Sequence, residues 1–230
     1  MSMLADKIIA FNRSLSFRGK LPDGIRILNP FRENKEVLPA MELFCKKFYN
    51  DNRKRKIILG INPGRHGAGT TGVPFTDTKR LAAICNIKMI SASTHEPSSV
   101  FIYDMMDAFG GAKKFYREFL ITAICPLGFV EKNERGNWVN RNYYDYPELF
   151  KAVEPFIIKT LRQQVRFNIE TNTCFVLGKK NAVFLQKIND REKFFKKIVV
   201  LEHPRYIQQY KLKSRDKYIK DYLKRLKETE

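Results

Sequence analysis

The stretch Ile57-Ile58-Leu59-Gly60-Ile61-Asn62-Pro63-Gly64 decides how this chain folds. Its first part, residues 57–61, is a short apolar run typical of a strand that is buried on both faces. A glycine-rich segment, residues 60–75, follows directly. Glycines let a backbone approach a ligand closely, and Asn62 at the strand end offers both an acceptor and a donor. The pattern predicts a strand that opens into a ligand-binding loop, with a turn-rich connection as the simpler alternative.

Further apolar runs predict more buried strands at residues 119–124, 174–177 and 198–201. Helical spacing of apolar residues predicts helices at residues 1–11, 37–52, 79–85, 147–167, 180–188 and about 216–228. Strands that alternate with helices indicate an α/β fold with a parallel sheet covered on both faces, whose ligands sit where strands end. Residues 15–34, 91–99 and 132–146 are expected to be irregular, and Tyr143 and Tyr144 in the last of them could stack on bases.

The charge of the chain favours a polyanionic partner. The 230 residues carry 43 Lys+Arg and 24 Asp+Glu, a net charge of +19. This excess attracts nucleic acid without regard to sequence, although a merely soluble basic protein is the alternative. The basic cluster at residues 53–56 could form part of a rim that contacts phosphates.

Composition also bounds the organisation of the chain. We expect one domain over residues 1–230, with a helical annex at 1–52, a core at 55–210 and a basic helix at 211–230. The 4 cysteines form no C-x-x-C pair, which argues for reduced, buried thiols and against a metal site. No apolar run is long enough to span a membrane, and residues 1–11 lack the layout of a signal peptide, so a cytoplasmic protein is expected, associated with the nucleoid if bacterial.

A second motif, His203-Pro204-Arg205-Tyr206, follows the last predicted strand. A histidine at the carboxyl end of a strand can point into the cleft of a parallel sheet and donate a hydrogen bond to a developing negative charge. A lone histidine is more often a structural residue. A functional role is more credible for both motifs together, because the parallel sheet would place them at the same edge.

Four segments together resemble the uracil-DNA glycosylase superfamily, most closely its single-strand-selective monofunctional group. They are Gly60–Gly64, Thr71-Gly72-Val73-Pro74-Phe75, Cys125-Pro126-Leu127 and His203-Pro204. The resemblance covers about residues 55–210 and implies a four-stranded parallel sheet between helices.

The resemblance also implies roles for single residues. Asn62 would position the attacking water or polarise the sugar, and Phe75 would stack on the flipped base. His203 would stabilise the uracil anion as the N-glycosidic bond breaks, and Gly64 would leave room beside the pyrimidine C5.

At two places the chain departs from the family pattern. Ala123 stands where the family has an asparagine that reads the uracil edge; with Ile61 and Pro63 it is expected to line the base pocket. The family's longer second motif is shortened here, so the residues that enter the DNA are expected to be Arg205, Tyr206 and Ile207. Further DNA contacts are expected from Arg65, Lys211 and Lys213.

The sequence thus favours a monofunctional DNA glycosylase that removes uracil or a related modified pyrimidine in base excision repair. It would act as a monomer on single- or double-stranded DNA, without metal or other cofactor and without a reacting lysine. Ala123 keeps open a catalytically silent nucleic-acid-binding module on the same fold. A small-molecule hydrolase that uses Asn62 and His203 is the third possibility.

Overall fold

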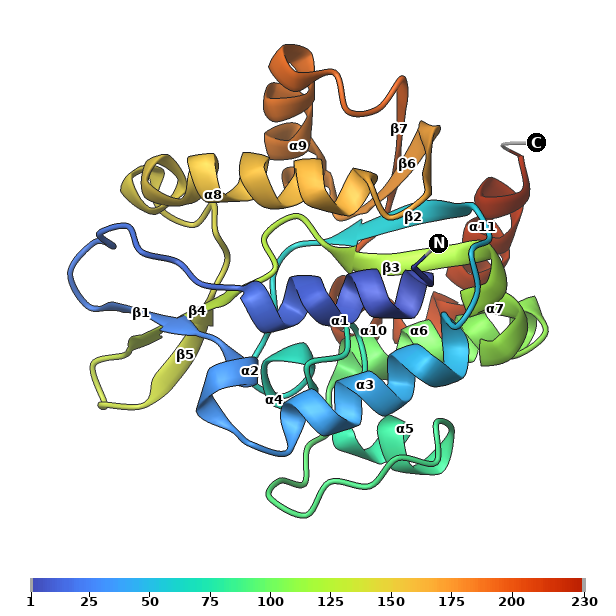
Figure 1. The fold of residues 1–230 in the computed structure, drawn as a ribbon, viewed down its shortest axis with the longest axis horizontal. Helices are drawn as coiled ribbons and strands as arrows, with labels where there is room; N and C mark the ends of the chain where they lie inside the picture. Colours follow the sequence, from blue (N-terminus) through green and yellow to red (C-terminus); the bar gives the residue numbers. More distant parts are fainter. Residues whose placement is uncertain (1, 229–230) are drawn as a thin grey trace.

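A four-stranded parallel sheet in the order β3-β2-β6-β7 forms the centre of the computed structural model, which describes residues 2–228 (Figure 1). Its strands are β2 (Arg55–Gly60), β3 (Phe119–Ala123), β6 (Ile169–Leu177) and β7 (Lys197–Leu201). The register places Ile58 of β2 opposite Ile121 of β3 and Phe175 of β6. The α/β class, the parallel sheet and its four predicted strands are confirmed. β6 begins earlier than predicted, because the polar residues 170–173 separate its buried first residue, Ile169, from the apolar run that starts at Cys174.

Helices cover both faces of this sheet. The helices α8 (Pro147–Val165) and α9 (Lys179–Glu192) lie on one side, and α6 (Pro97–Phe109) and α7 (Ala112–Glu118) lie on the other (Figure 1). Right-handed crossovers between parallel strands explain this arrangement. The crossover from β2 to β3 runs one way across the sheet, and those from β3 to β6 and from β6 to β7 run the other way, so their helices lie on opposite faces. The sheet is therefore the middle one of three layers.

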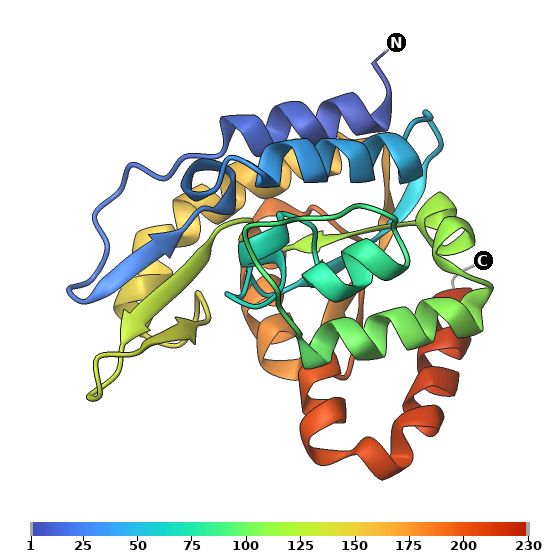
Figure 2. The same cartoon turned by 90° about the horizontal axis from the view of Figure 1, so that it is seen from below.

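The remaining helices complete the two ends of the molecule. The helices α1 (Leu4–Ser14) and α3 (Val37–Phe48) pack against each other. After β7, α10 (Pro204–Tyr210) and α11 (Arg215–Lys227) pack against α6, as Figure 2 shows. Short turns of helix are α2 (Pro30–Glu33), α4 (Ala68–Thr71), α5 (Thr78–Ala83) and the 3₁₀ turn Leu212–Ser214. The predicted helices are confirmed with shifted ends; the predicted positions 1, 229 and 230 lie outside the described residues.

A second, antiparallel sheet was not predicted. It contains β1 (Ile25–Leu28), β4 (Gly128–Lys132) and β5 (Trp138–Arg141) in the order β1-β4-β5. The expectation of irregular structure at residues 15–34 and 132–146 is therefore wrong in part. All three strands are short, β1 and β5 are mostly half-exposed, and β1 pairs with β4 from far along the chain, so no local apolar pattern marks the sheet.

The helix α6 has no counterpart among the predicted elements, and it begins inside the segment 91–99 that was expected to be irregular. Its buried residues cover most of the helix, and α10 and α11 pack against it. The narrow exposed or half-exposed stripe contains apolar Val100 and Ala108 beside Asp104 and Asp107, so apolar and polar residues are not cleanly separated. Its sequence therefore lacks the periodicity by which the other helices are recognised.

The predicted burial of the thiols is confirmed. Cys45, Cys85, Cys125 and Cys174 are free and buried. Burial raises the pKa of Cys45 and of Cys125 to about 12. Within residues 2–228, none of the helices is both long and apolar enough to cross a membrane.

Candidate active site

The carboxyl ends of the parallel strands meet at one edge of the sheet and border a cavity of about 350 Å³. Gly60, the last residue of β2, pairs with Ala123, the last residue of β3. His203 comes two residues after β7 ends. The structure brings together all the residues predicted for catalysis and base binding, which line the cavity: Ile61, Asn62, Pro63, Gly64, Phe75, Ala123 and His203.

Phe75 forms part of the cavity wall beside the end of β2. Its φ of 53° lies in the left-handed region, which a phenylalanine rarely adopts. A Cβ built on Gly60 would lie 2.6 Å from Phe75 Cε2, so the ring rests directly on the glycine backbone. The ring centroid is 6.3 Å from that of His203, at an angle of 49° between the ring planes. A flat apolar surface and a nitrogen donor therefore adjoin in the same cavity.

His203 is held in one tautomer by the helix that follows it. It caps α10, and its Nδ1 accepts a hydrogen bond of 3.1 Å from the backbone N–H of Arg205. The proton of the neutral ring is therefore on Nε2. Burial, and then the charge of Arg205, lower the pKa of His203 to about 4. At neutral pH the side chain is an uncharged donor.

Asn62 makes contacts that the sequence did not predict. Its Oδ1 accepts a hydrogen bond of 3.0 Å from the backbone N–H of Tyr143. Its Nδ2 donates one of 3.1 Å to the carbonyl of Arg141. The side chain thus fastens the first motif to the segment between β5 and α8. A second lone pair of Oδ1 remains for a ligand.

Ala123 adjoins a side-chain amide that comes from another part of the chain. Gln164 of α8 is buried and lines the cavity. Its Nε2 donates to the carbonyl of Ala123 at 3.3 Å, and its Oε1 accepts from Thr122 Oγ1 at 2.8 Å. No sequence motif identifies Gln164, because it is one polar position on the buried face of a long helix.

Glu96 also lines the cavity, although no sequence motif marks it. It is the N-cap of α6, and its backbone N–H donates to Asp77 Oδ2 at 2.8 Å. Burial, and then the nearby Asp77, raise the pKa of Glu96 to about 7, while Arg205 opposes the rise. Its neighbours in the sequence are Thr, His and Pro in an irregular segment, so no local pattern distinguishes it.

The residues predicted to contact DNA differ in exposure. Arg205, Tyr206, Lys211 and Lys213 are exposed on or after α10, and Arg65 is partly buried. Ile207 is wrongly predicted, because its side chain is fully buried in the core and cannot enter DNA from there.

Two further expectations about nucleic-acid contacts are corrected. Tyr143 and Tyr144 are buried rather than exposed; the hydroxyl of Tyr143 donates to Asn181 Oδ1 at 2.9 Å. Arg55, in the cluster at residues 53–56, is fully buried and paired with Asp51 at 2.8 Å. This cluster begins β2, whereas the cavity lies at the carboxyl end of the strand.

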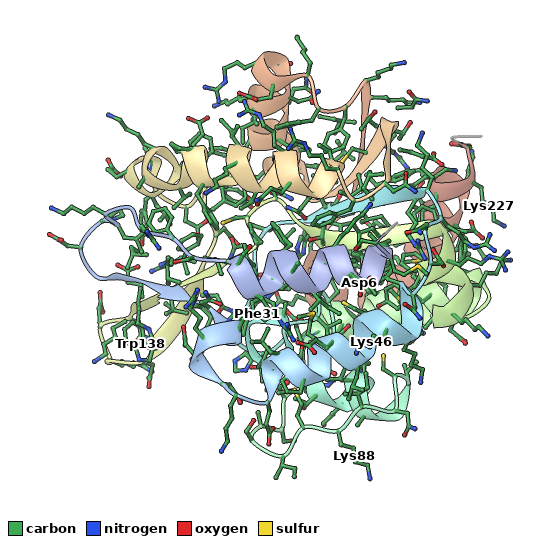
Figure 3. All side chains as sticks on the ribbon, in the orientation of Figure 1. Asp6, Phe31, Lys46, Lys88, Trp138 and Lys227 are labelled. Carbon is green, nitrogen blue, oxygen red and sulfur yellow. The ribbon has the colours of Figure 1, made fainter. Side chains whose placement is uncertain are left out.

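Three exposed lysines lie apart from one another: Lys46 on α3, Lys88 after α5 and Lys227 at the end of α11 (Figure 3). None of the described residues that line the cavity is a lysine. Within residues 2–228, no group of three or more His, Cys, Asp or Glu side chains is arranged to hold a metal ion.

Comparisons with known proteins agree with this geometry. The sequence profile of the Uracil DNA glycosylase superfamily matches residues 46–227. The crystal structure of SMUG2 from Pedobacter heparinus is 53% identical in sequence with a TM-score of 0.96, and the match covers 99% of this chain and 98% of that one. No curated protein sequence matches the chain. The chain therefore belongs to the uracil DNA glycosylase superfamily, in its SMUG-like group, and is a DNA glycosylase, a hydrolase of N-glycosyl bonds.

Proposed function

We propose that this enzyme removes uracil, or a related modified pyrimidine, from DNA as a monofunctional glycosylase in base excision repair. The observation that carries the proposal is the neutral His203, whose Nε2–H is the free donor beside Phe75 in the cavity. A leaving base that becomes an anion needs such a donor, and an uncharged one serves over a wide range of pH.

The reaction starts with a nucleotide turned out of the DNA so that its base enters the cavity. Phe75 stacks on the base, and Gly64 leaves room beside it. The bond between C1′ and the base then breaks, leaving positive charge on the sugar and negative charge on the base. His203 Nε2–H donates a hydrogen bond to the anion. This hydrogen bond stabilises the transition state more than the bound substrate, because the negative charge exists only in the transition state and after it.

Water completes the hydrolysis by bonding to C1′. Asn62 orients this water or the sugar through the lone pair of Oδ1 that its contact with Tyr143 leaves free. The absence of a lysine from the described lining of the cavity supports a monofunctional enzyme, since a lyase needs an amine that forms a Schiff base.

The DNA backbone contacts the protein at α10, next to the cavity. Arg205 and Tyr206 start α10 next to His203, and Lys211 and Lys213 follow it, all four exposed. Phosphate contacts there hold the strand in place while base contacts in the cavity give selectivity. We further propose that a single chain is the active unit.

Release of the base from a panel of oligonucleotides tests the proposed function. Uracil, 5-hydroxymethyluracil and cytosine are placed in matched single- and double-stranded DNA, and abasic product is measured in single turnover. We expect uracil release and no covalent adduct on borohydride treatment. DNA that binds without any release would favour the silent module, and hydrolysis of free nucleosides alone would favour a small-molecule enzyme.

A further inference from the structure

The carboxylate of Glu96 packs directly on the glycine loop of the first motif. A Cβ built on Gly67 would lie 2.0 Å from Glu96 Oε2, and one built on Gly64 would lie 3.7 Å from Oε1. The same point at Gly64 is 3.3 Å from Nδ2 of Asn140. The carboxylate therefore occupies the part of the cavity that borders Gly64, where the base and its sugar must come in the proposed function.

The backbone of Glu96 is fixed, while its carboxylate is left free. Asp77 Oδ2 accepts the hydrogen bond from Glu96 N, and Asp77 is itself fully buried and paired with Arg80 at 2.9 Å. By contrast, the described part of the chain supplies no hydrogen bond to either oxygen of Glu96. A carboxylate that faces a cavity with its acceptor sites open can accept a hydrogen bond from water.

Asn62 cannot perform the same task. Its amide is already bonded to two backbone groups, those of Tyr143 and Arg141. An amide oxygen can orient a water molecule, but it does not take up a proton at neutral pH. Hydrolysis needs a group that does, since the water that bonds to C1′ must lose a proton.

We propose that Glu96 is a catalytic residue whose carboxylate accepts the proton of the attacking water. This inference rests on the proposed function. The water oxygen forms a bond to C1′ as the bond from C1′ to the base breaks, and the electron pair of that bond leaves with the base. The proton of the water passes to Glu96, and His203 Nε2–H donates to the base anion, which later takes a proton from solvent. Glu96 then releases its proton to solvent.

The charged surroundings suit a base that works near neutral pH. Asp77 and its partner Arg80 approach Glu96 from α5, and the neighbouring His95 lies 3.9 Å from Asp77. Arg205 approaches from α10, and its positive charge opposes the rise in the pKa of Glu96 to about 7.

Two further histidines lie near the charge of Arg205, and one of them, His203, lines the cavity. The pKa of His203 is lowered to about 4, chiefly by burial. The pKa of His66 is also lowered, by burial and by the charges of Arg65 and Arg205. The His203 ring is therefore neutral near pH 7, where Glu96 changes its charge.

A pH series in single turnover tests this role. Uracil excision by the wild type, Glu96→Gln and the control Glu134→Gln is measured from about pH 5.5 to 8.5. Glu134 is an exposed carboxylate in the turn between β4 and β5. We expect the wild type and the control to gain rate as pH rises through about 7 and then to level off. Glu96→Gln is expected to lose ~10²–10⁴-fold in rate and the pH dependence with it.

Chemical rescue separates proton transfer from packing. Glu96→Ala leaves space for formate, which should restore part of its rate, whereas formate should leave Glu96→Gln unchanged. His95→Asn should keep the wild-type pH profile. An undiminished rate and an unchanged profile in Glu96→Gln would overturn the role of Glu96 while leaving the proposed function intact. A wild type that releases no base at all would overturn both.

Discussion

Gly60→Ala is expected to slow base excision severely by displacing the ring of Phe75, although the substitution changes none of the residues to which a chemical role is assigned. The added Cβ would lie 2.6 Å from Phe75 Cε2 and 2.7 Å from Cζ, and ordinary contact begins at 3.4 Å, so the ring must retreat by about 0.8 Å. Phe75 has little freedom to absorb this, because its backbone is already in the left-handed region. A misplacement of about 1 Å can cost ~10²-fold in rate, which is about 2.7 kcal/mol of activation free energy.

The assay separates this effect from a loss of folding or of DNA binding. Single-turnover uracil excision, DNA affinity by fluorescence anisotropy and the melting temperature are measured for Gly60→Ala, Phe75→Ala and the double variant. We expect a slow Gly60→Ala that still binds DNA and still melts cooperatively. If the glycine acts through the ring, adding Gly60→Ala to Phe75→Ala costs little more. Full additivity of the two losses, or wild-type turnover in Gly60→Ala, would refute this explanation.

The other predictions concern the remaining parts of the site. His203→Ala should lose ~10²–10³-fold in rate. Because the pKa of His203 is lowered to about 4, the wild type should not lose activity as pH rises through the usual range of imidazole; a collapse there would contradict the neutral donor. Asn62→Ala should slow excision and also lower the melting temperature, since two backbone groups lose their partner at ~1–3 kcal/mol each. Charge reversal of Lys211 and Lys213 should reduce the slope of log affinity against log salt concentration by about two. A DNA affinity of the wild type that does not change with salt concentration would contradict phosphate contacts there. Ala123→Asn should raise the ratio of uracil to cytosine excision, because a hydrogen-bonded base edge rejects analogues more strongly than shape does; an unchanged ratio would place base recognition elsewhere.

The central sheet could be predicted because β2, β3 and the second half of β6 contain consecutive buried apolar residues, and the edge strand β7 is also an apolar run. Ile58, Phe175 and their neighbours in the strands are buried on both faces of the sheet, so no position alternates to a polar residue and the sequence is a continuous apolar run. The parallel direction then follows from the helices between the runs, and it places the ends of β2 and β7 at one edge. That is why Asn62 and His203, far apart in the sequence, could be expected in one cleft.

Contacts between distant segments could not be predicted in the same way. Tyr143 lies in a polar segment that resembles a surface loop, yet its hydroxyl is bonded to Asn181 of α9 and its backbone N–H to Asn62. Both partners are defined only by the folded sheet. Glu96 is a similar case, because its importance comes from Gly67 and Arg205, which lie on other elements.

The density of glycines in the first motif has a different cause from the one that the sequence suggested. Glycines there were expected to let the backbone approach a ligand, but two of them instead face the protein itself. A Cβ on Gly69 would lie 2.7 Å from the carbonyl oxygen of Gly64 and 2.4 Å from Leu28, while one on Gly67 would lie 2.0 Å from Glu96. These positions allow no side chain because the loop is tightly packed, with β1 on one side and the carboxylate on the other. Of these three glycines, Gly64 is the least crowded: the atoms nearest its missing Cβ are Nδ2 of Asn140 at 3.3 Å and Oε1 of Glu96 at 3.7 Å. A substrate that approaches the loop there meets a carboxylate and an amide rather than bare backbone, so the first motif acts by holding these two side chains in place as much as by its own residues.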